Sequence, residues 1–292
     1  MRIRGKINLT LCAAFAVGLG LAGIGAYKVL IDNAVENSVR EARIMIESAS
    51  AVRSYTAESI SPLLQQQMKV AFLPYAIPSF AAQTNFHTVQ KKLPEYSYRE
   101  PTLNPTNVND RAADWEADIV NDFRNNPEKT ETIVIRDTPV GTYLTLSRPL
   151  KASSQSCQAC HSTPDVAPPT MIALYGSQNG FGWKLGETIG AQVVSIPMSA
   201  PLERARRTLL LVMAALAATF VVIIAIVDTL LRALVIKPVV AIAEMADEVS
   251  MGKLDAPVFV RNSKDEIGTL AVSFNRMRNS LQNAITMLEQ QT

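Results

Sequence analysis

Two long apolar stretches stand out in the pattern of hydrophobic and polar positions along the chain. The first runs from Leu9 to Tyr27 and the second from Thr208 to Leu231. A helix needs about 20 predominantly apolar residues to cross the hydrocarbon core of a bilayer. The pattern therefore predicts two transmembrane helices, at residues 9–31 and 208–231, with a short segment, 1–8, before the first.

The first stretch also has features of a secretory signal sequence. Basic residues lie ahead of it, and Gly23 to Ala26 at its end has the small side chains of a cleavage site. The run is long for the apolar part of a signal sequence, so we favour a retained helix. Cleavage is the alternative, and it would leave one membrane helix instead of two.

Asp228 and Cys12 are the side chains of most interest within these stretches. Asp228 lies near the end of the second stretch and four residues before Arg232, so a helix would bring the two together. We predict an ion pair near the lipid headgroups rather than a functional carboxylate inside the membrane. Cys12 is expected to behave as a small apolar residue.

Residues 32–207, between the two stretches, are predicted to form one α+β domain. Asp32 to about Pro62 lacks helix breakers, which predicts a helix that continues outward from the membrane. The prolines between Pro74 and Pro105 then predict loops and turns. Helical spacing returns from Ala112 to Arg124, with its apolar residues on one face.

Strand patterns fill the rest of this domain. A hairpin turn is indicated at Asp137 to Gly141, and an inserted loop is expected around Cys157 to His161. The predicted strands are Thr130–Ile135, Thr142–Leu150, Met171–Tyr175 and Ile189–Ile196. Together they predict an antiparallel sheet.

After the second stretch, apolar residues recur in alternating steps of four and three. A linker at Gly252–Ser263 separates two series: Val235, Val239, Ile242, Ala246 and Val249, then Ile267, Leu270, Phe274, Met277, Leu281, Ala284 and Leu288. This spacing is typical of a coiled coil or a parallel four-helix bundle. Helices this short are not stable alone in water, so we predict a homodimer.

Composition and charge exclude some classes of protein. The chain has 28 Lys and Arg against 26 Asp and Glu, a net charge of +2, and no basic stripe of the kind that binds nucleic acid. The sequence shows no nucleophile–base pair, no phosphate-binding loop and no second metal-ligand cluster. We therefore predict neither enzymatic activity nor a nucleic-acid partner.

The segment Cys157–His161 (CQACH) carries the clearest chemistry. CxxCH is the attachment signature of a c-type haem, in which two thiols join the porphyrin and the histidine becomes the proximal iron ligand. A thioredoxin-like redox pair does not need the histidine, and a closed zinc site needs four ligands. With three cysteines and two histidines in 292 residues, chance is a poor explanation. We predict one covalent haem c on Cys157, Cys160 and His161.

This motif also decides the predicted topology. Basic residues before the first stretch, with Arg232 and Lys237 after the second, favour cytoplasmic termini, but Arg204 to Arg207 lie on the opposite side. Because c-type haem is attached outside the cytoplasmic membrane, residues 32–207 are predicted to be periplasmic. The chain is then a multi-pass protein of the bacterial inner membrane.

The segment after the second stretch resembles a HAMP domain, the linker module of bacterial transmembrane receptors. The matching residues are Pro238, Gly252, Asp265–Gly268 and Phe274–Met277. The resemblance covers residues 232–284 and implies a homodimeric parallel four-helix bundle, with Pro238 and Glu266 at signal-relay positions. A carboxylate such as Glu266 is favoured at a helix start. Residues 285–292 are expected to extend the last helix.

The region before the second stretch resembles the PAS-like extracytoplasmic sensor domains that carry a single c-type haem. Such domains occur on histidine kinases, on chemoreceptors and as free-standing proteins. The resemblance spans about residues 35–200 and is carried by Pro94–Arg99, Leu103–Asn107, Cys157–His161 and Gly180–Glu187. It implies a haem between the long helix and a PAS-like antiparallel sheet.

The remaining contacts of such a haem stay open at the level of sequence. His87 and Met45 are candidates for the sixth iron ligand, with a surface histidine and apolar packing as the alternatives. Arg53, Arg99 and Lys184 are candidates to pair with the haem propionates, with exposed surface charge as the alternative.

Two functions follow from these predictions. One is a membrane-bound sensor of redox state or of a diatomic gas, relayed through the HAMP segment to a separate cytoplasmic transmitter, since the sequence continues only to Thr292. The other is a membrane-anchored monohaem cytochrome with an electron-transfer partner, or an accessory subunit of a respiratory or photosynthetic complex.

Overall fold

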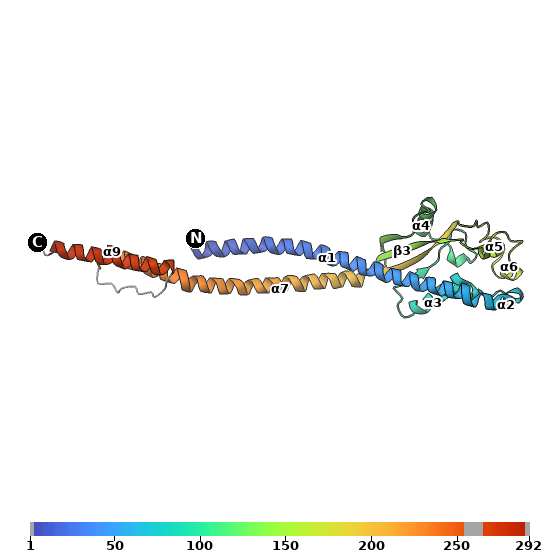
Figure 1. The fold of residues 1–292 in the computed structure, drawn as a ribbon, viewed down its shortest axis with the longest axis horizontal. Coiled ribbons are helices and arrows are strands. Elements are labelled where there is room, and N and C mark those ends of the chain that lie inside the picture. Colours follow the sequence, from blue (N-terminus) through green and yellow to red (C-terminus); the bar gives the residue numbers. More distant parts are fainter. Residues whose placement is uncertain (1–2, 254–264, 290–292) are drawn as a thin grey trace. The chain divides into compact units, whose positions relative to one another are not determined.

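The computed structural model describes residues 3–253 and 265–289 (Figure 1). The chain divides into two compact units. One unit consists of Met1–Ala26 together with Leu209–Thr292, and the other of Tyr27–Thr208. The second unit holds the sheet and the CxxCH motif.

A long helix runs through most of the first sixty residues. Helix α1 spans Ile3–Tyr55 and continues as a π-helix over Thr56–Ile60, which confirms the helix predicted from Asp32 onward. Its packed face in the second unit is made of small residues and one isoleucine: Ala34, Ser38, Ala42, Ile46 and Ala49. Steps of four and three place them on one face, and their small side chains allow close approach to the sheet.

The proline-containing stretch differs from its prediction as loops and turns. It contains α3 (Pro78–Gln90), and α2 (Gln65–Val70) lies just before it. Pro78 is the first residue of α3, a position where its missing N–H costs nothing because that group has no partner within the helix. His87 therefore lies on an exposed part of a helix and not in a loop.

The described residues form one four-stranded antiparallel sheet in the order β1-β4-β3-β2. The strands are β1 (Ser97–Arg99), β2 (Thr132–Thr138), β3 (Gly141–Lys151) and β4 (Thr188–Pro197). The predicted hairpin and the last predicted strand are confirmed. Strand β1 lies within the Pro94–Arg99 motif and pairs with β4.

Helices cover both faces of this sheet. On one face, α1 and α3 pack on Leu144 and Leu146 of β3 and on neighbouring residues of β4. On the other, α4 (Asp114–Asn125) buries Val120 and Phe123 against Ala191 and Val193. The predicted helix over Ala112–Arg124 is confirmed, and the unit is a mixture of helices and antiparallel sheet.

Two short segments near the motif are helical where other structure was expected. The predicted strand Met171–Tyr175 lies in α6 (Pro169–Tyr175). A short apolar run does not distinguish a strand from a buried helical turn, and Pro169 at the helix start together with Gly176 after its end decides for the helix. The CxxCH segment, expected in a loop, forms α5 (Gln155–His161).

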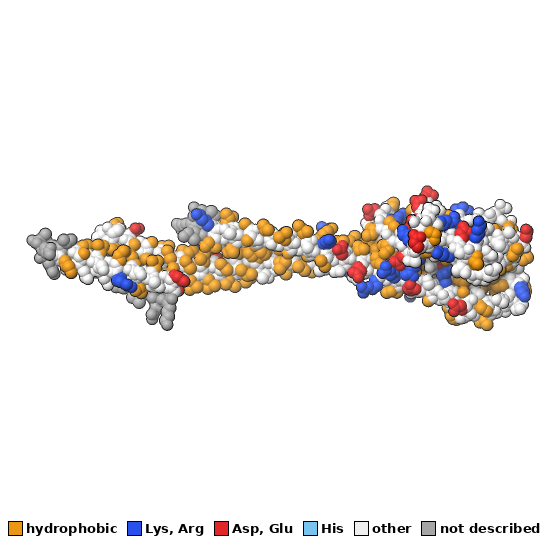
Figure 2. All heavy atoms as spheres, turned by 45° about the horizontal axis from the view of Figure 1, so that its top comes forward, with side chains coloured by type: hydrophobic (Ala, Val, Ile, Leu, Met, Phe, Trp, Pro, Cys, Tyr) orange, Lys and Arg blue, Asp and Glu red, His pale blue; other side chains and the backbone are white. Residues whose placement is uncertain are grey.

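In the other unit, the N-terminal part of α1 pairs with α7 (Ser199–Leu231). Both described helices are long and apolar enough to cross a membrane, and Figure 2 shows apolar side chains over their surface. Phe15 stacks on Phe220 with ring centroids 3.5 Å apart, and Gly23 lies beside Met213.

A polar contact lies at one end of this helix pair. Arg4 Nε donates to Asp228 Oδ1 over 2.7 Å, and Asn8 Nδ2 donates to the same oxygen over 3.1 Å. Asp228 therefore pairs directly with Arg4 of the neighbouring helix. Arg232, the predicted partner, interacts with Asp228 through its charge, without a direct ion pair among the described residues. The carboxylate of Asp228 accepts three hydrogen bonds from the neighbouring helix, two from Arg4 and one from Asn8. Two side chains thus share the acceptor sites of this carboxylate, whereas a pair with Arg232 would use one.

Beyond α7, a π-helix (Arg232–Ile236) leads into α8 (Lys237–Ser250), and α9 spans Glu266–Glu289. Helices α8 and α9 pack through Ile242, Val249 and Phe274 of the two predicted apolar series, together with Ala271, which lies outside the series. Other members of the series are exposed in the single chain, among them Leu270, Met277 and Leu281. Most of the predicted linker, Gly252–Ser263, lies outside the described residues.

Candidate functional site

Helix α5 brings the two motif cysteines to one side. The Ser154 hydroxyl caps its start by accepting a hydrogen bond from Ser156 N over 3.1 Å. Cys157 and Cys160 are three residues apart, so they are neighbours on the helix surface, and both are partly buried free thiols. Burial, and secondarily the other thiol, raises the pKa of Cys160, which keeps it protonated at neutral pH.

The imidazole of His161 is held at one nitrogen and on one face. Nδ1 lies 2.7 Å from the Gly180 carbonyl oxygen and 3.3 Å from Thr106 Oγ1. The ring stacks on Trp183, with centroids 3.8 Å apart and planes 15° apart. Burial lowers the pKa of His161, against the opposing effect of the Gly180 carbonyl. Because a carbonyl only accepts, Nδ1 carries the proton and Nε2 presents its lone pair.

The loop around Gly180 is fixed from both sides. Gly180 N donates to Asn104 Oδ1 over 3.1 Å, and Asn104 Nδ2 donates to the Phe181 carbonyl over 3.3 Å. Gly182 N and Trp183 N donate to backbone carbonyls at the end of α5. Gly180 has φ +85°, and a Cβ there would lie 2.8 Å from the Cα of Thr106, so only glycine fits.

These contacts explain two sequence motifs whose roles the sequence did not reveal. Leu103–Asn107 supplies Asn104 and Thr106, and Gly180–Glu187 supplies Gly180 and Trp183. Asn104 and Gly180 are 76 residues apart in the sequence. The two segments meet at the histidine of a third motif. The sequence indicates the two segments as motifs, but only the fold shows which of their residues contact His161.

The candidate sixth ligands lie on helices α1 and α3. Met45 of α1 is partly buried and packs on the core between α1 and the sheet. His87 is exposed on α3. Within residues 3–253 and 265–289, no described hydrogen bond joins either side chain to α5. Ligation by His87 or Met45 stays a prediction.

The three candidate propionate partners differ in their surroundings. Arg53 pairs with Glu100, and Arg99 Nη1 lies 3.0 Å from Glu116 Oε1. Both glutamates are 1% exposed at the side chain, and a buried carboxylate is costly without its partner. Lys184 is exposed. Pairing with a propionate stays a prediction for all three, and for the arginines it would compete with an existing carboxylate.

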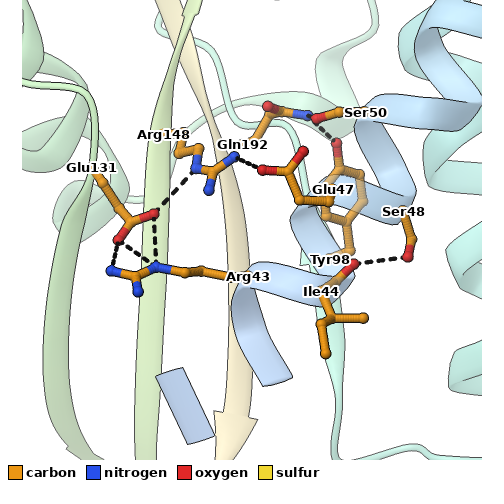
Figure 3. Close-up of polar contacts among 9 residues, drawn as sticks. All are labelled: Arg43, Ile44, Glu47, Ser48, Ser50, Tyr98, Glu131, Arg148 and Gln192. Carbon is orange, nitrogen blue, oxygen red and sulfur yellow. Dashed lines mark hydrogen bonds and ion pairs between the residues drawn. The ribbon is translucent and has the colours of Figure 1, made fainter. Parts of the chain in front are cut away.

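A polar network ties α1 to the sheet (Figure 3). Glu131, just before β2, accepts from Arg43 Nη2 over 2.7 Å and from Arg148 Nε over 3.2 Å. Arg148 Nη1 also donates to Glu47 over 2.6 Å. Burial raises the pKa of Glu131, but the two guanidinium groups outweigh it and the pKa is lowered. Two residues of α1 thus form ion pairs with the sheet region: Arg43 with Glu131, just before β2, and Glu47 with Arg148 of β3.

A second, more buried network lies one to two turns further along α1. Tyr98 donates from its hydroxyl to Glu100 Oε1 over 2.6 Å, and Gln192 Nε2 donates to that hydroxyl over 2.9 Å. Gln192 also reaches Ser50 over 3.4 Å (Figure 3), and Arg53 completes the connection to Glu100. Burial, with the nearby Glu100, raises the pKa of Tyr98, so the phenol stays a donor.

Two family models match parts of this chain. Residues 32–197 match the family model described as Tll0287-like, and residues 230–283 match the HAMP domain model. The chain is also similar to the crystal structure of the cyanobacterial heme-protein Tll0287, with 18% identity and a TM-score of 0.44. That match covers 55% of this chain and 95% of the other. No curated protein matches.

Proposed function

We propose that this chain, which belongs to the Tll0287-like family, is a membrane-bound signalling protein that carries one covalent haem c. Cys157 and Cys160 would form the two thioether bonds, and His161 would bind the iron. When bound, such a group would supply a reversible one-electron change. The name of the similar solved protein, a heme-protein, supports this assignment.

The state of His161 is the observation that carries the proposal. Its Nδ1 donates to the Gly180 carbonyl over 2.7 Å, and its ring lies flat against Trp183. Iron-binding histidines commonly hold their second nitrogen in this way, which fixes the tautomer and the ring orientation. The two thiols of α5 lie within one helical turn of it. The residues present therefore fit a covalently attached haem.

The same proposal assigns the parts of the chain to a membrane topology. Residues 9–31 and 208–231 would span the bacterial inner membrane, with the PAS-like haem domain, 32–207, in the periplasm. Residues 232–284 would form the cytoplasmic HAMP module, extended by 285–292. The two apolar helices and the HAMP match support this order.

In this proposal the periplasmic domain acts on the membrane helices through α1. The networks of Glu131 and Glu100 hold α1 on the sheet, so a rearrangement of the sheet would act on that helix. The HAMP module would pair with a second chain through its exposed apolar residues, with Pro238 and Glu266 at its relay positions. A separate cytoplasmic transmitter would read its state.

Electron transfer by a membrane-anchored cytochrome is the second candidate, favoured by the position of the haem motif on a partly exposed helix. Amide hydrogen exchange of the full chain, oxidised with ferricyanide or reduced with dithionite, separates the two. A redox sensor requires a difference in exchange in α8 or α9 between the two states, and a gas sensor requires one between the reduced protein with and without carbon monoxide. Identical exchange in all three states would favour the electron carrier.

The signal itself is tested by the visible spectrum of the reduced protein before and after carbon monoxide. A large shift of the Soret band would indicate an open or easily displaced sixth position and support gas sensing. An unchanged low-spin spectrum would indicate two firmly held ligands and support redox sensing. Absence of covalent haem from protein made with a cytochrome c maturation system would overturn the proposed function.

A further inference from the structure

The side chain of Asn104 spans one particular peptide unit. Its Oδ1 accepts from Gly180 N, and its Nδ2 donates to the carbonyl of Phe181. Between these two backbone groups lies the peptide that joins Gly180 to Phe181. The carbonyl oxygen of that peptide is the one that accepts from His161 Nδ1 over 2.7 Å. Asn104 therefore fixes the orientation of the peptide plane that holds the histidine.

The loop needs such a support. Gly180 adopts φ +85°, a conformation in which no repeating secondary structure holds the carbonyl in place. Thr106 packs against the same glycine, 2.8 Å from where a Cβ would lie. Gly182 also has a positive φ, +79°. Without the two hydrogen bonds of Asn104, rotation of the peptide plane would turn the Gly180 carbonyl away from the imidazole.

We infer that Asn104 is a positioning residue that sets the reduction potential of the iron bound by His161, an inference that rests on the proposed function. A well-aligned Nδ1–H···O bond leaves more electron density on Nε2 and raises the basicity of the ligand. A more basic axial ligand stabilises the ferric state over the ferrous state and lowers the potential. Asn104 would thus affect the iron indirectly, because it orients the Gly180 carbonyl, which in turn accepts the hydrogen bond of His161.

The test compares the midpoint potentials of Asn104→Ala and Asn179→Ala with that of the wild-type full chain. Asn179 lies on the same loop, but its Oδ1 accepts from Arg111 over 3.3 Å and not from the Gly180–Phe181 backbone. We expect a higher potential in Asn104→Ala and the wild-type potential in Asn179→Ala. The reduced-to-oxidised ratio at the wild-type midpoint should rise roughly twofold to tenfold, the range of a hydrogen bond's net contribution.

The direction of the shift separates positioning from general loosening. If the substitution only exposed the haem to water, solvation would favour the more charged ferric state and the potential would fall. A fall, or a wild-type potential with haem attached, would overturn the inference. Asn104→Leu, which has a similar volume and adds no charge but loses both hydrogen bonds, should give a similar rise. If Asn104→Ala does not fold, a wild-type potential in Asn104→Leu overturns the inference.

Failure of the proposed function gives a different result. In that case the wild-type protein itself would lack covalent haem, as measured by the alkaline pyridine spectrum of the purified full chain. A wild-type chain with haem whose potential does not depend on Asn104 would leave the proposed function in place and remove only this inference.

Discussion

At the scale of single residues, the candidate site joins one local motif to two distant loops, because His161 contacts Thr106, Gly180 and Trp183. Cys157, Cys160 and His161 are recognisable because their spacing alone defines the haem-attachment motif. Asn104 and Trp183 are not, because their contacts with the histidine region depend on two loops that are distant in sequence. An amide or an indole in a loop has no local signature for such a role.

Gly180 gives the first prediction at this scale. Gly180→Ala adds a Cβ that would meet Thr106, in addition to left-handed backbone strain, whereas the same change at Gly182 meets nothing within 4 Å. We expect a loss of about 1 kcal/mol of stability for Gly182→Ala, from the backbone alone. For Gly180→Ala we expect about 3 kcal/mol, because overpacking adds to the strain. Chemical denaturation of the full chain in detergent measures both, and equal losses would contradict the clash.

Glu131 gives a prediction about pH. Its pKa is lowered in the folded state, so its contribution is fully present above the usual glutamate pKa of about 4.3. That contribution is lost as pH falls through the lower, folded pKa. Glu131→Gln should therefore destabilise the protein at pH 7, by about 1 kcal/mol, and the difference from wild type should vanish in acid.

Thermal unfolding at a series of pH values checks this expectation. Glu58→Gln is the matched control, because Glu58 is exposed on the π-helix that follows α1. The control should follow the wild-type pH profile throughout. A Glu131→Gln difference that persisted unchanged below the folded pKa would show that the carboxylate charge is not the source of the stability.

At the scale of elements, periodicity predicted long segments well and short ones poorly. The extension of α1, helix α4 and the β2–β3 hairpin each carry several repeats of their pattern. Met171–Tyr175 offers a short apolar run that suits a strand or a helix, and flanking residues decided for α6. The prolines around Pro78 predict loops and turns, although Pro78 itself starts α3.

The pairing of α1 with α7 leads to a prediction about helix register. Phe15 stacks on Phe220, whereas the adjacent Val221 is 65% exposed. In a Cys12→Ser background, cysteines at positions 15 and 220 should form an intrachain disulfide when membranes are treated with a mild oxidant. Cysteines at positions 15 and 221 should cross-link much less. Equal yields from the two pairs, read on non-reducing gels, would contradict the register.

At the scale of the whole molecule, the sequence predicted one architecture from three independent signals. Apolar runs, the haem motif and the alternating series after Leu231 each point to a separate part. Comparisons support the haem-domain family and the HAMP module. The exposed apolar residues of α9, such as Leu270, Met277 and Leu281, support the predicted assembly with a second copy of the chain.

The dimer prediction is tested on α9. Met277 belongs to the predicted apolar series and is 60% exposed, while Val272 is outside the series and 56% exposed. Met277→Glu should shift the full chain in detergent from dimer toward monomer, because a carboxylate would be buried in the bundle. Val272→Glu should leave it dimeric. Light scattering after size-exclusion chromatography measures both, and two dimeric variants would contradict an interface through this series.

Covalent attachment of one haem is the central claim, and the intact mass of the purified full chain tests it most directly. The protein would be produced in a bacterium that matures c-type cytochromes, beside the double variant Cys157→Ser/Cys160→Ser. We predict that the wild-type mass exceeds that of the polypeptide by one haem and that the variant has the polypeptide mass alone. A wild-type chain at the polypeptide mass, or added mass that survives loss of both thiols, would contradict the account.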